Sequence, residues 1–131
     1  MYDHTQVGHD RRQARSENTQ VALTRLLEAA RRSAELEALA LGDELGLLMA
    51  GAGAAELCDE LAAVAPLFGS PNVELPLSLD VLGAGTEVRR LAIDGTELFI
   101  CGRGGDLDAA LRQAVAGCAR ILVEKKARLA H

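Results

Sequence analysis

Two glycine-rich loops carry the residue types best suited to binding an anion. The sequence GAGAAE at 51–56 has glycines where a dinucleotide-binding turn needs them, because free backbone N–H groups at a helix start attract phosphate. Glu56, however, places a negative charge where a pyrophosphate would lie, which favours a plain strand-to-helix turn. In the second loop, Arg103 could hold an anion, or the glycines could simply make the turn. The residues of this second candidate site are Gly102, Arg103, Gly104 and Gly105.

The cysteines, histidines and acidic pairs do not form a catalytic or metal-binding pattern. The sequence contains no Cys-x-x-Cys, and no histidine lies at ligand spacing from a cysteine. The histidines stand at positions 4, 9 and 131, and the cysteines are Cys58, Cys101 and Cys118. Adjacent carboxylates at 43–44 and 59–60 fall on a turn and on the polar side of a helix, where solvated surface explains them. We therefore expect no enzyme activity, no bound metal and no cofactor.

The composition excludes several classes of partner. The chain has 131 residues, a formal net charge of −5 and a pI near 5.2, and only 2% of its residues are aromatic. Such a protein lacks the positive charge and the stacking surfaces that nucleic acids require. No apolar run approaches the ~18 residues of a membrane span, and the first residues lack the apolar core of a signal peptide. We expect a cytoplasmic, single-domain protein with no membrane insertion.

Hydrophobic periodicity predicts three helices and five strands. In chain order these are a helix at 19–34, strands at 36–41 and 47–50, a helix at 54–68, strands at 73–82, 88–93 and 96–101, and a helix at 106–126. We expect residues 1–18 to form a disordered tail, because they hold few side chains that could be buried. Residues 127–131 are predicted as a short basic tail, whose cations suit the end of the last helix. A single domain then spans 19–126.

The clearest local signal is a hairpin at 88–101. Asp94-Gly95 between the runs VRRLAI and TELFIC is typical of a two-residue type I′ turn, and such a turn sets the pairing of its strands. The predicted pairs are Ile93–Thr96, Ala92–Glu97, Leu91–Leu98, Arg90–Phe99, Arg89–Ile100 and Val88–Cys101. Apolar residues fall on both faces, so this sheet needs helices on both sides. Arg89 and Arg90 could contact an acidic partner or pair with nearby acids such as Glu97.

The strand at 73–82 alternates apolar and polar residues more regularly than any other segment. Leu75, Leu77 and Leu79 share the apolar face, and polar residues occupy the other. Pro76 has no N–H to donate in the middle of a sheet, so the segment is predicted as an edge strand or as a strand broken near its start.

The helix at 54–68 has an apolar arc wider than packing on one core requires. Large residues form one stripe (Leu57, Leu61, Val64 and Phe68) and small residues the adjoining stripe (Ala54, Cys58, Ala62 and Ala65). The large stripe can pack on the sheet while the small stripe admits a second helix at close range, which would make a homodimer. Alternatively, both stripes are buried within one subunit. Pro66 is expected to kink or end the last turn.

Three stretches of sequence carry a recognisable pattern. They are ALALGDELGLLMAGAG at 38–53, VRRLAIDGTELFICGRGG at 88–105 and GCARIL at 117–122. Together with the order of elements, they resemble the bacterial branch of the roadblock / dynein light chain family. Gly42 and Leu45 depart from that pattern, which has a β-branched residue at the first position and Asp or Asn at the second. The resemblance implies an α+β fold of order α-β-β-α-β-β-β-α. In it, a five-stranded antiparallel sheet has the first and last helices on one face and the middle helix on the other.

The resemblance also implies a function without catalysis. Bacterial members look like partners of Ras-like small GTPases that act as homodimeric regulators or scaffolds in signalling, with their middle helices meeting. The residues that we assign to self-association or partner contact are Leu57, Cys58, Leu61, Ala62, Ala65, Leu75, Leu77, Leu79, Arg89 and Arg90. Two alternatives stay open: a small-anion or nucleotide-binding regulatory domain that uses Gly102–Asp106, and a purely architectural subunit of a dimer or heterodimer.

Overall fold

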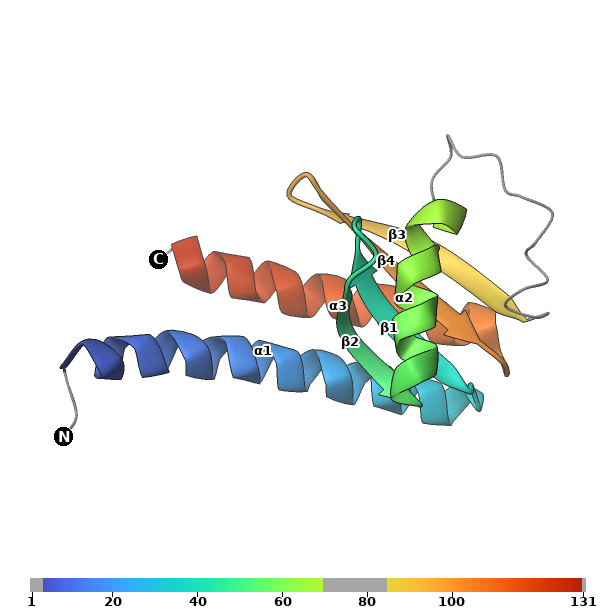
Figure 1. The fold of residues 1–131 in the computed structure, drawn as a ribbon, viewed down its shortest axis with the longest axis horizontal. Helices are drawn as coiled ribbons and strands as arrows, with labels where there is room; N and C mark the ends of the chain where they lie inside the picture. The colour runs from blue at the N-terminus through green and yellow to red at the C-terminus, as the bar shows by residue number, and fades with distance from the viewer. Residues whose placement is uncertain (1–3, 70–84, 131) are drawn as a thin grey trace.

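The computed structural model describes residues 4–69 and 85–130, in which three helices accompany a four-stranded antiparallel sheet (Figure 1). The elements are α1 (His4–Ala34), β1 (Ala38–Asp43), β2 (Leu48–Gly53), α2 (Ala55–Gly69), β3 (Thr86–Ile93), β4 (Thr96–Arg103) and α3 (Leu107–Ala130). The class is α+β, as predicted. The predicted strand at 73–82, with Leu75, Leu77 and Leu79, lies outside the described residues, so the fifth strand stays a prediction.

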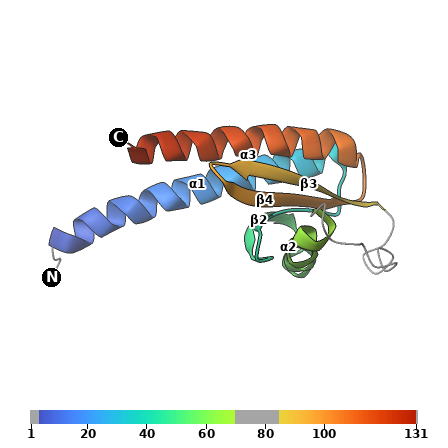
Figure 2. The same ribbon diagram turned by 90° about the horizontal axis from the view of Figure 1, so that it is seen from above.

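The helices cover both faces of the sheet. The strands lie in the order β2-β1-β4-β3, and each is antiparallel to its neighbour. Figure 2 shows α1 and α3 together on one face and α2 on the other. The layers are therefore arranged as the family resemblance implied.

Each face of the sheet has its own apolar core. The core under α1 and α3 consists mainly of large residues, among them Leu23, Leu27, Leu39, Leu41, Leu91, Leu98, Ile100 and Leu111. The core under α2 consists mainly of small ones: Ala38, Ala40, Cys58, Leu61, Ala65, Phe99 and Cys101. Because successive side chains of a strand point to opposite faces, β1 sends its leucines to the first core and its alanines to the second.

The hairpin of β3 and β4 has the predicted register. All six predicted pairs occur, from Ile93 opposite Thr96 to Val88 opposite Cys101. Asp94 and Gly95 form the turn with φ of 53° and 80°, and a type I′ turn requires positive φ at both positions. This short connection leaves the two strands only one way to pair, which explains why local sequence was sufficient to predict it.

The helix bounds differ from the predicted ones. Helix α1 begins at His4 instead of residue 19, so most of the expected disordered tail is helical. Residues 4–18 hold three Arg and two Gln, which favour helix even where few apolar residues are available for burial. Helix α3 likewise continues to Ala130, through most of the expected basic tail. Helix α2 continues past Pro66 to Gly69, because a proline removes one hydrogen bond while the packed residue before it, Ala65, stays fully buried.

Two glycine substitutions separate backbone strain from steric overlap. A Cβ atom at Gly95 would meet nothing within 4 Å, so Gly95→Ala is expected to lower the free energy of unfolding by strain alone, about 1 kcal/mol. A Cβ atom at Gly105, whose φ is 55°, would overlap the Ala34 carbonyl oxygen, so Gly105→Ala should cost about 3 kcal/mol. Urea unfolding of both variants measures the difference. Equal losses would contradict the close packing of the β4–α3 junction on α1.

Candidate functional site

Most of the α2 residues predicted at a dimer interface are buried in this chain's own core. Cys58, Leu61, Ala62 and Ala65 expose 2% of their surface or less, and Leu57 is half-buried beside them. The helix of a second copy has no access to the four buried side chains. The expected helix–helix contact is therefore wrong for these four residues, which pack within their own subunit, whereas Leu57 keeps part of its surface exposed.

Small residues on the strands explain why the small stripe of α2 faces the sheet. A Cβ atom at Gly51 would lie 2.9 Å from the Cys58 Sγ atom, and one at Gly42 would lie 3.1 Å from the Ala62 Cβ atom. The Cys58 thiol also donates a hydrogen bond to the Ala52 carbonyl oxygen, at 3.3 Å. The stripe does permit a close approach, as its composition indicated, but the neighbour that approaches is the sheet.

A different set of apolar residues is exposed around the β1–β2 turn and on α2. Leu45, Leu47 and Leu48 expose 80%, 61% and 37% of their surface, and Leu67 of α2 exposes 51%. We call these four residues the leucine surface. Sequence reasoning missed it because a short apolar run, such as the predicted strand at 47–50, does not show which of its side chains are covered. The available signal was Leu45, which stands where the family pattern has Asp or Asn.

The predicted anion-binding loop between β4 and α3 is a structural junction. The Gly104 N–H donates to the Gly85 carbonyl oxygen and the Asp106 N–H to the Ala34 carbonyl oxygen, both at 2.9 Å. The Arg103 Nε atom lies 3.0 Å from a carboxylate oxygen of the glutamate that precedes β1. These donors therefore hold the loop to α1 and to the start of β3.

Arg89 and Arg90 pair with acids of their own chain. The Arg90 Nη1 atom lies 3.6 Å from Glu97 Oε1, and the Arg89 Nη2 atom lies 3.3 Å from Glu87 Oε2 and 3.7 Å from Asp108 Oδ1. Solvent-exposed pairs of this kind stabilise a fold only slightly. The residues around the neighbouring shallow hollow of about 350 Å³ between β3 and α3 are Arg89, Asp108, Leu111, Arg112, Val115 and Ala116.

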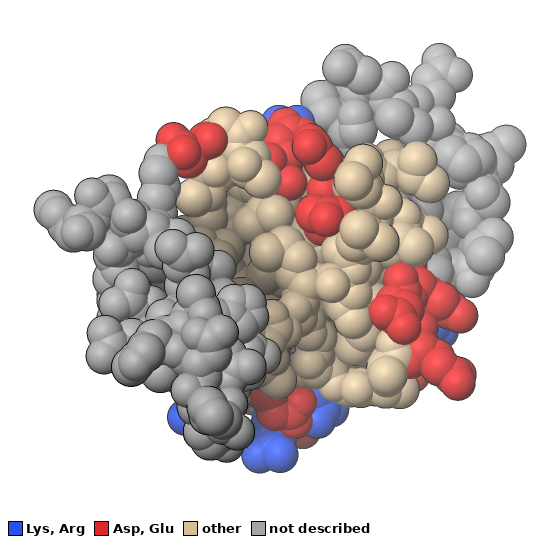
Figure 3. All heavy atoms as spheres, turned by 60° about the vertical axis from the view of Figure 1, so that its left-hand side comes forward, with Lys and Arg blue, Asp and Glu red and all other residues tan. Residues whose placement is uncertain are grey.

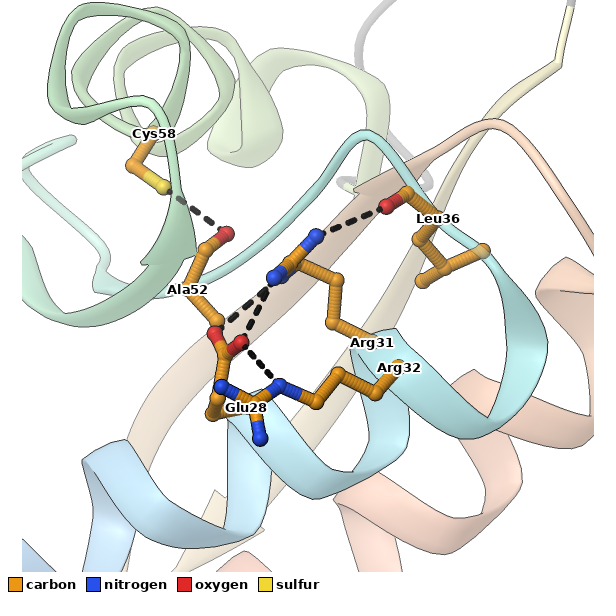
Figure 4. A network of polar contacts seen from close by, with 6 residues as sticks. All are labelled: Glu28, Arg31, Arg32, Leu36, Ala52 and Cys58. Atoms are coloured by element: carbon orange, nitrogen blue, oxygen red, sulfur yellow. Dashed lines mark hydrogen bonds and ion pairs between the residues drawn. The ribbon is translucent and has the colours of Figure 1, made fainter.

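A charged network holds the end of α1 to the turn that leads into β1 (Figure 4). Glu28 Oε1 lies 2.5 Å from Arg31 Nη2 and 2.9 Å from Arg32 Nε, while Arg31 Nη1 donates to the Leu36 carbonyl oxygen at 3.3 Å. The hydrogen bond from Arg31 holds the pKa of the Glu28 carboxyl below its ordinary value of 4.5, and partial desolvation opposes that shift. The ionised pair thus fixes the geometry of the α1–β1 turn.

The three cysteines are buried and poorly suited to act as nucleophiles. Burial raises the pKa of the Cys101 thiol to about 12 and that of the Cys118 thiol to about 11. The pKa of Cys58 is also raised, mainly by burial. Since the thiolate is the reactive form, these side chains act as small apolar residues of the cores.

Comparisons with known proteins bear on the fold. No family model matches the sequence, and no curated protein matches it. Among solved structures, Myxococcus xanthus MglB matches with 12% sequence identity and a TM-score of 0.55, over 80% of this chain and 90% of that chain. This chain has the roadblock-like fold of MglB. The fold expected from the sequence pattern is thereby confirmed, although the sequences have diverged widely.

Three further features concern only the residues that the structure describes. None of their helices is long and apolar enough to cross a membrane. They also hold no group of three or more His, Cys, Asp or Glu that could bind a metal ion. Among residues 18–67 and 85–123, whose side chains the structure describes, six large hydrophobic residues are exposed and four of them belong to the leucine surface.

The Glu28 network makes a predictable contribution to acid stability. Because the folded pKa of Glu28 lies below 4.5, its stabilising effect is present at neutral pH and is lost as the pH falls through the folded pKa. Glu28→Gln should therefore lower the free energy of unfolding at pH 7 and change it much less near pH 3. Urea unfolding of variant and wild type at the two pH values measures this. An equal difference at both would contradict an ionic role for Glu28.

Proposed function

We propose that this chain is a non-enzymatic regulatory or scaffold protein that binds a Ras-like small GTPase. The observation that carries the proposal is the roadblock-like fold shared with MglB. The bacterial proteins that the sequence resembles look like partners of such GTPases and have no nucleophiles of their own. We place this chain with them in the bacterial cytoplasm, as a signalling protein.

The mode of action that we propose is the presentation of a surface. Small GTPases change the order of their switch segments with the bound nucleotide, so a protein that contacts those segments can read or bias the nucleotide state. Contiguous exposed apolar residues commonly mark protein–protein contacts. The leucine surface supplies such residues on a turn and a helix that the sheet holds in place. We assign it to partner binding.

We also propose a homodimer. Cys58, Leu61, Ala62 and Ala65 take no part in the proposed dimer, because they are buried in their own subunit, while Leu57 stays a proposed contact residue. Leu75, Leu77 and Leu79 remain proposed for self-association, and in the sequence they precede β3, which is one of the two edge strands of the described sheet. An architectural subunit would share this assembly but would bind no GTPase.

GTPase binding tests the proposal. Purified Ras-like GTPases loaded with GDP or with a non-hydrolysable GTP analogue should bind this chain with different affinities, as measured by calorimetry. Leu47→Ser should weaken binding about tenfold, because it removes an exposed apolar contact. Val123→Ser on α3, also at an exposed position, is the matched control and should leave the affinity unchanged. Binding to neither nucleotide form would contradict the proposal.

The mass in solution tests the homodimer. Light scattering at tens of micromolar should give twice the mass of one 13.8 kDa chain. Cys58→Ala should not split the dimer, because Cys58 is buried within one subunit. A strict monomer at these concentrations would contradict self-association.

A further inference from the structure

The leucine surface lies where the β1–β2 turn crosses α2. A Cβ atom at Gly46, in the middle of the turn, would lie 3.1 Å from the Ala63 carbonyl oxygen. Leu45 and Leu47 flank Gly46, and Leu67 lies one helical turn beyond Ala63 on the exposed side of α2. The turn and the helix therefore place their exposed leucines next to each other.

The turn that carries two of the leucines is held in one conformation. Asp43 Oδ1 accepts hydrogen bonds from the Leu45 N–H at 2.9 Å and from the Leu47 N–H at 3.0 Å. Backbone hydrogen bonds from Asp43 to the Leu47 carbonyl and from Gly46 to the Asp43 carbonyl close the same turn. A contact surface that is ordered before binding loses less conformational entropy when a partner docks.

The segment that carries the leucine surface holds acidic residues and no basic ones. The sequence has no Lys or Arg between Arg32 and Arg89, a stretch that contains both the β1–β2 turn and α2. The carboxylates on the turn and on the outer side of α2 are Asp43, Glu44, Glu56, Asp59 and Glu60. On the face drawn in Figure 3, acidic side chains border an uncharged central area, and basic side chains lie at its lower edge.

The charge distribution around the leucine surface indicates which kind of molecule can bind there. A second copy that docked by the same face would bring two sets of carboxylates together, and juxtaposed like charges oppose association. A surface with apolar residues flanked by Lys or Arg would fill the apolar centre and neutralise its acidic margin. We propose that the leucine surface binds a basic, amphipathic segment of a partner protein. The inference rests on the proposed function in one respect: the partner that carries this basic segment is taken to be the GTPase.

A designed peptide tests the chemistry without the natural partner. The probe is a synthetic amphipathic helix of Leu and Lys, and its control is the same peptide with Glu in place of every Lys. In NMR titrations of the full chain, the Lys peptide should shift amide signals of residues 43–48 and of the exposed side of α2. The Glu peptide should shift none of them. Raising the ionic strength from about 0.1 to about 0.5 M should weaken the binding of the Lys peptide.

Matched variants measure separately how the exposed leucines and the acidic side chains contribute to peptide binding. Leu47→Ser keeps every charge and should weaken binding of the Lys peptide about tenfold, whereas Val123→Ser should leave it unchanged. Asp59→Asn combined with Glu60→Gln should reduce the salt dependence of Lys-peptide binding.

The inference is overturned if the Lys peptide shifts signals elsewhere on the chain or if Leu47→Ser binds the peptide as wild type does. It is also overturned if Leu47→Ser converts a dimer into a monomer, because the occupant is then a second copy. Loss of GTPase binding with the peptide results intact would overturn only the proposed function.

Discussion

The side chains of β1 from Ala38 to Leu41 are completely buried, and they alternate between small and large. Leu39 and Leu41 fill the core between the sheet and the helices α1 and α3. On the other face, the short side chains of Ala38 and Ala40 let α2 lie close to the sheet. Because β1 pairs with both β2 and β4, this alternation sets the distance of every helix from the sheet. A strand covered on both faces also requires a helical layer on each side, which is the architecture of the whole domain.

The difference between the large residues on one face of β1 and the small residues on the other also determines which side chains of α2 stay exposed. Alanine and glycine on the strands let α2 approach closely, and this contact occupies the small stripe that includes Cys58 and Ala62. What α2 and the β1–β2 turn present to solvent is the leucine surface and its acidic surroundings. The contact that we propose for a partner is therefore short and apolar, and it lies on a turn that hydrogen bonds hold in place.

The extent to which sequence predicted this structure depended on the range of each interaction. The hairpin at 88–101 was predicted pair by pair, because the Asp94-Gly95 turn sets its register locally. Periodicity placed Cys58, Leu61 and Ala65 on the apolar side of α2, where they are buried, but it does not show which surface covers them. The surface that covers the small stripe of α2 is the sheet, and the close contact is possible because Gly51 of β2 has no side chain. Only the folded arrangement of β2 beside β1 brings Gly51 to Cys58. The exposure of Leu47 was missed for the same reason, since a short apolar run reads alike whether a helix covers it or not.

The orientation of α2 can be measured directly by methyl NMR with a soluble paramagnetic agent, at a protein concentration low enough to keep single chains apart. The agent broadens the signals of methyl groups that it can approach from solvent. We expect strong broadening for Leu45, Leu47 and Leu67, and signals as sharp as those of Leu39 for Leu61. Broadening of Leu61 comparable to that of Leu47 would mean that the stripe of α2 faces solvent, and it would contradict the packing from which the partner surface is inferred.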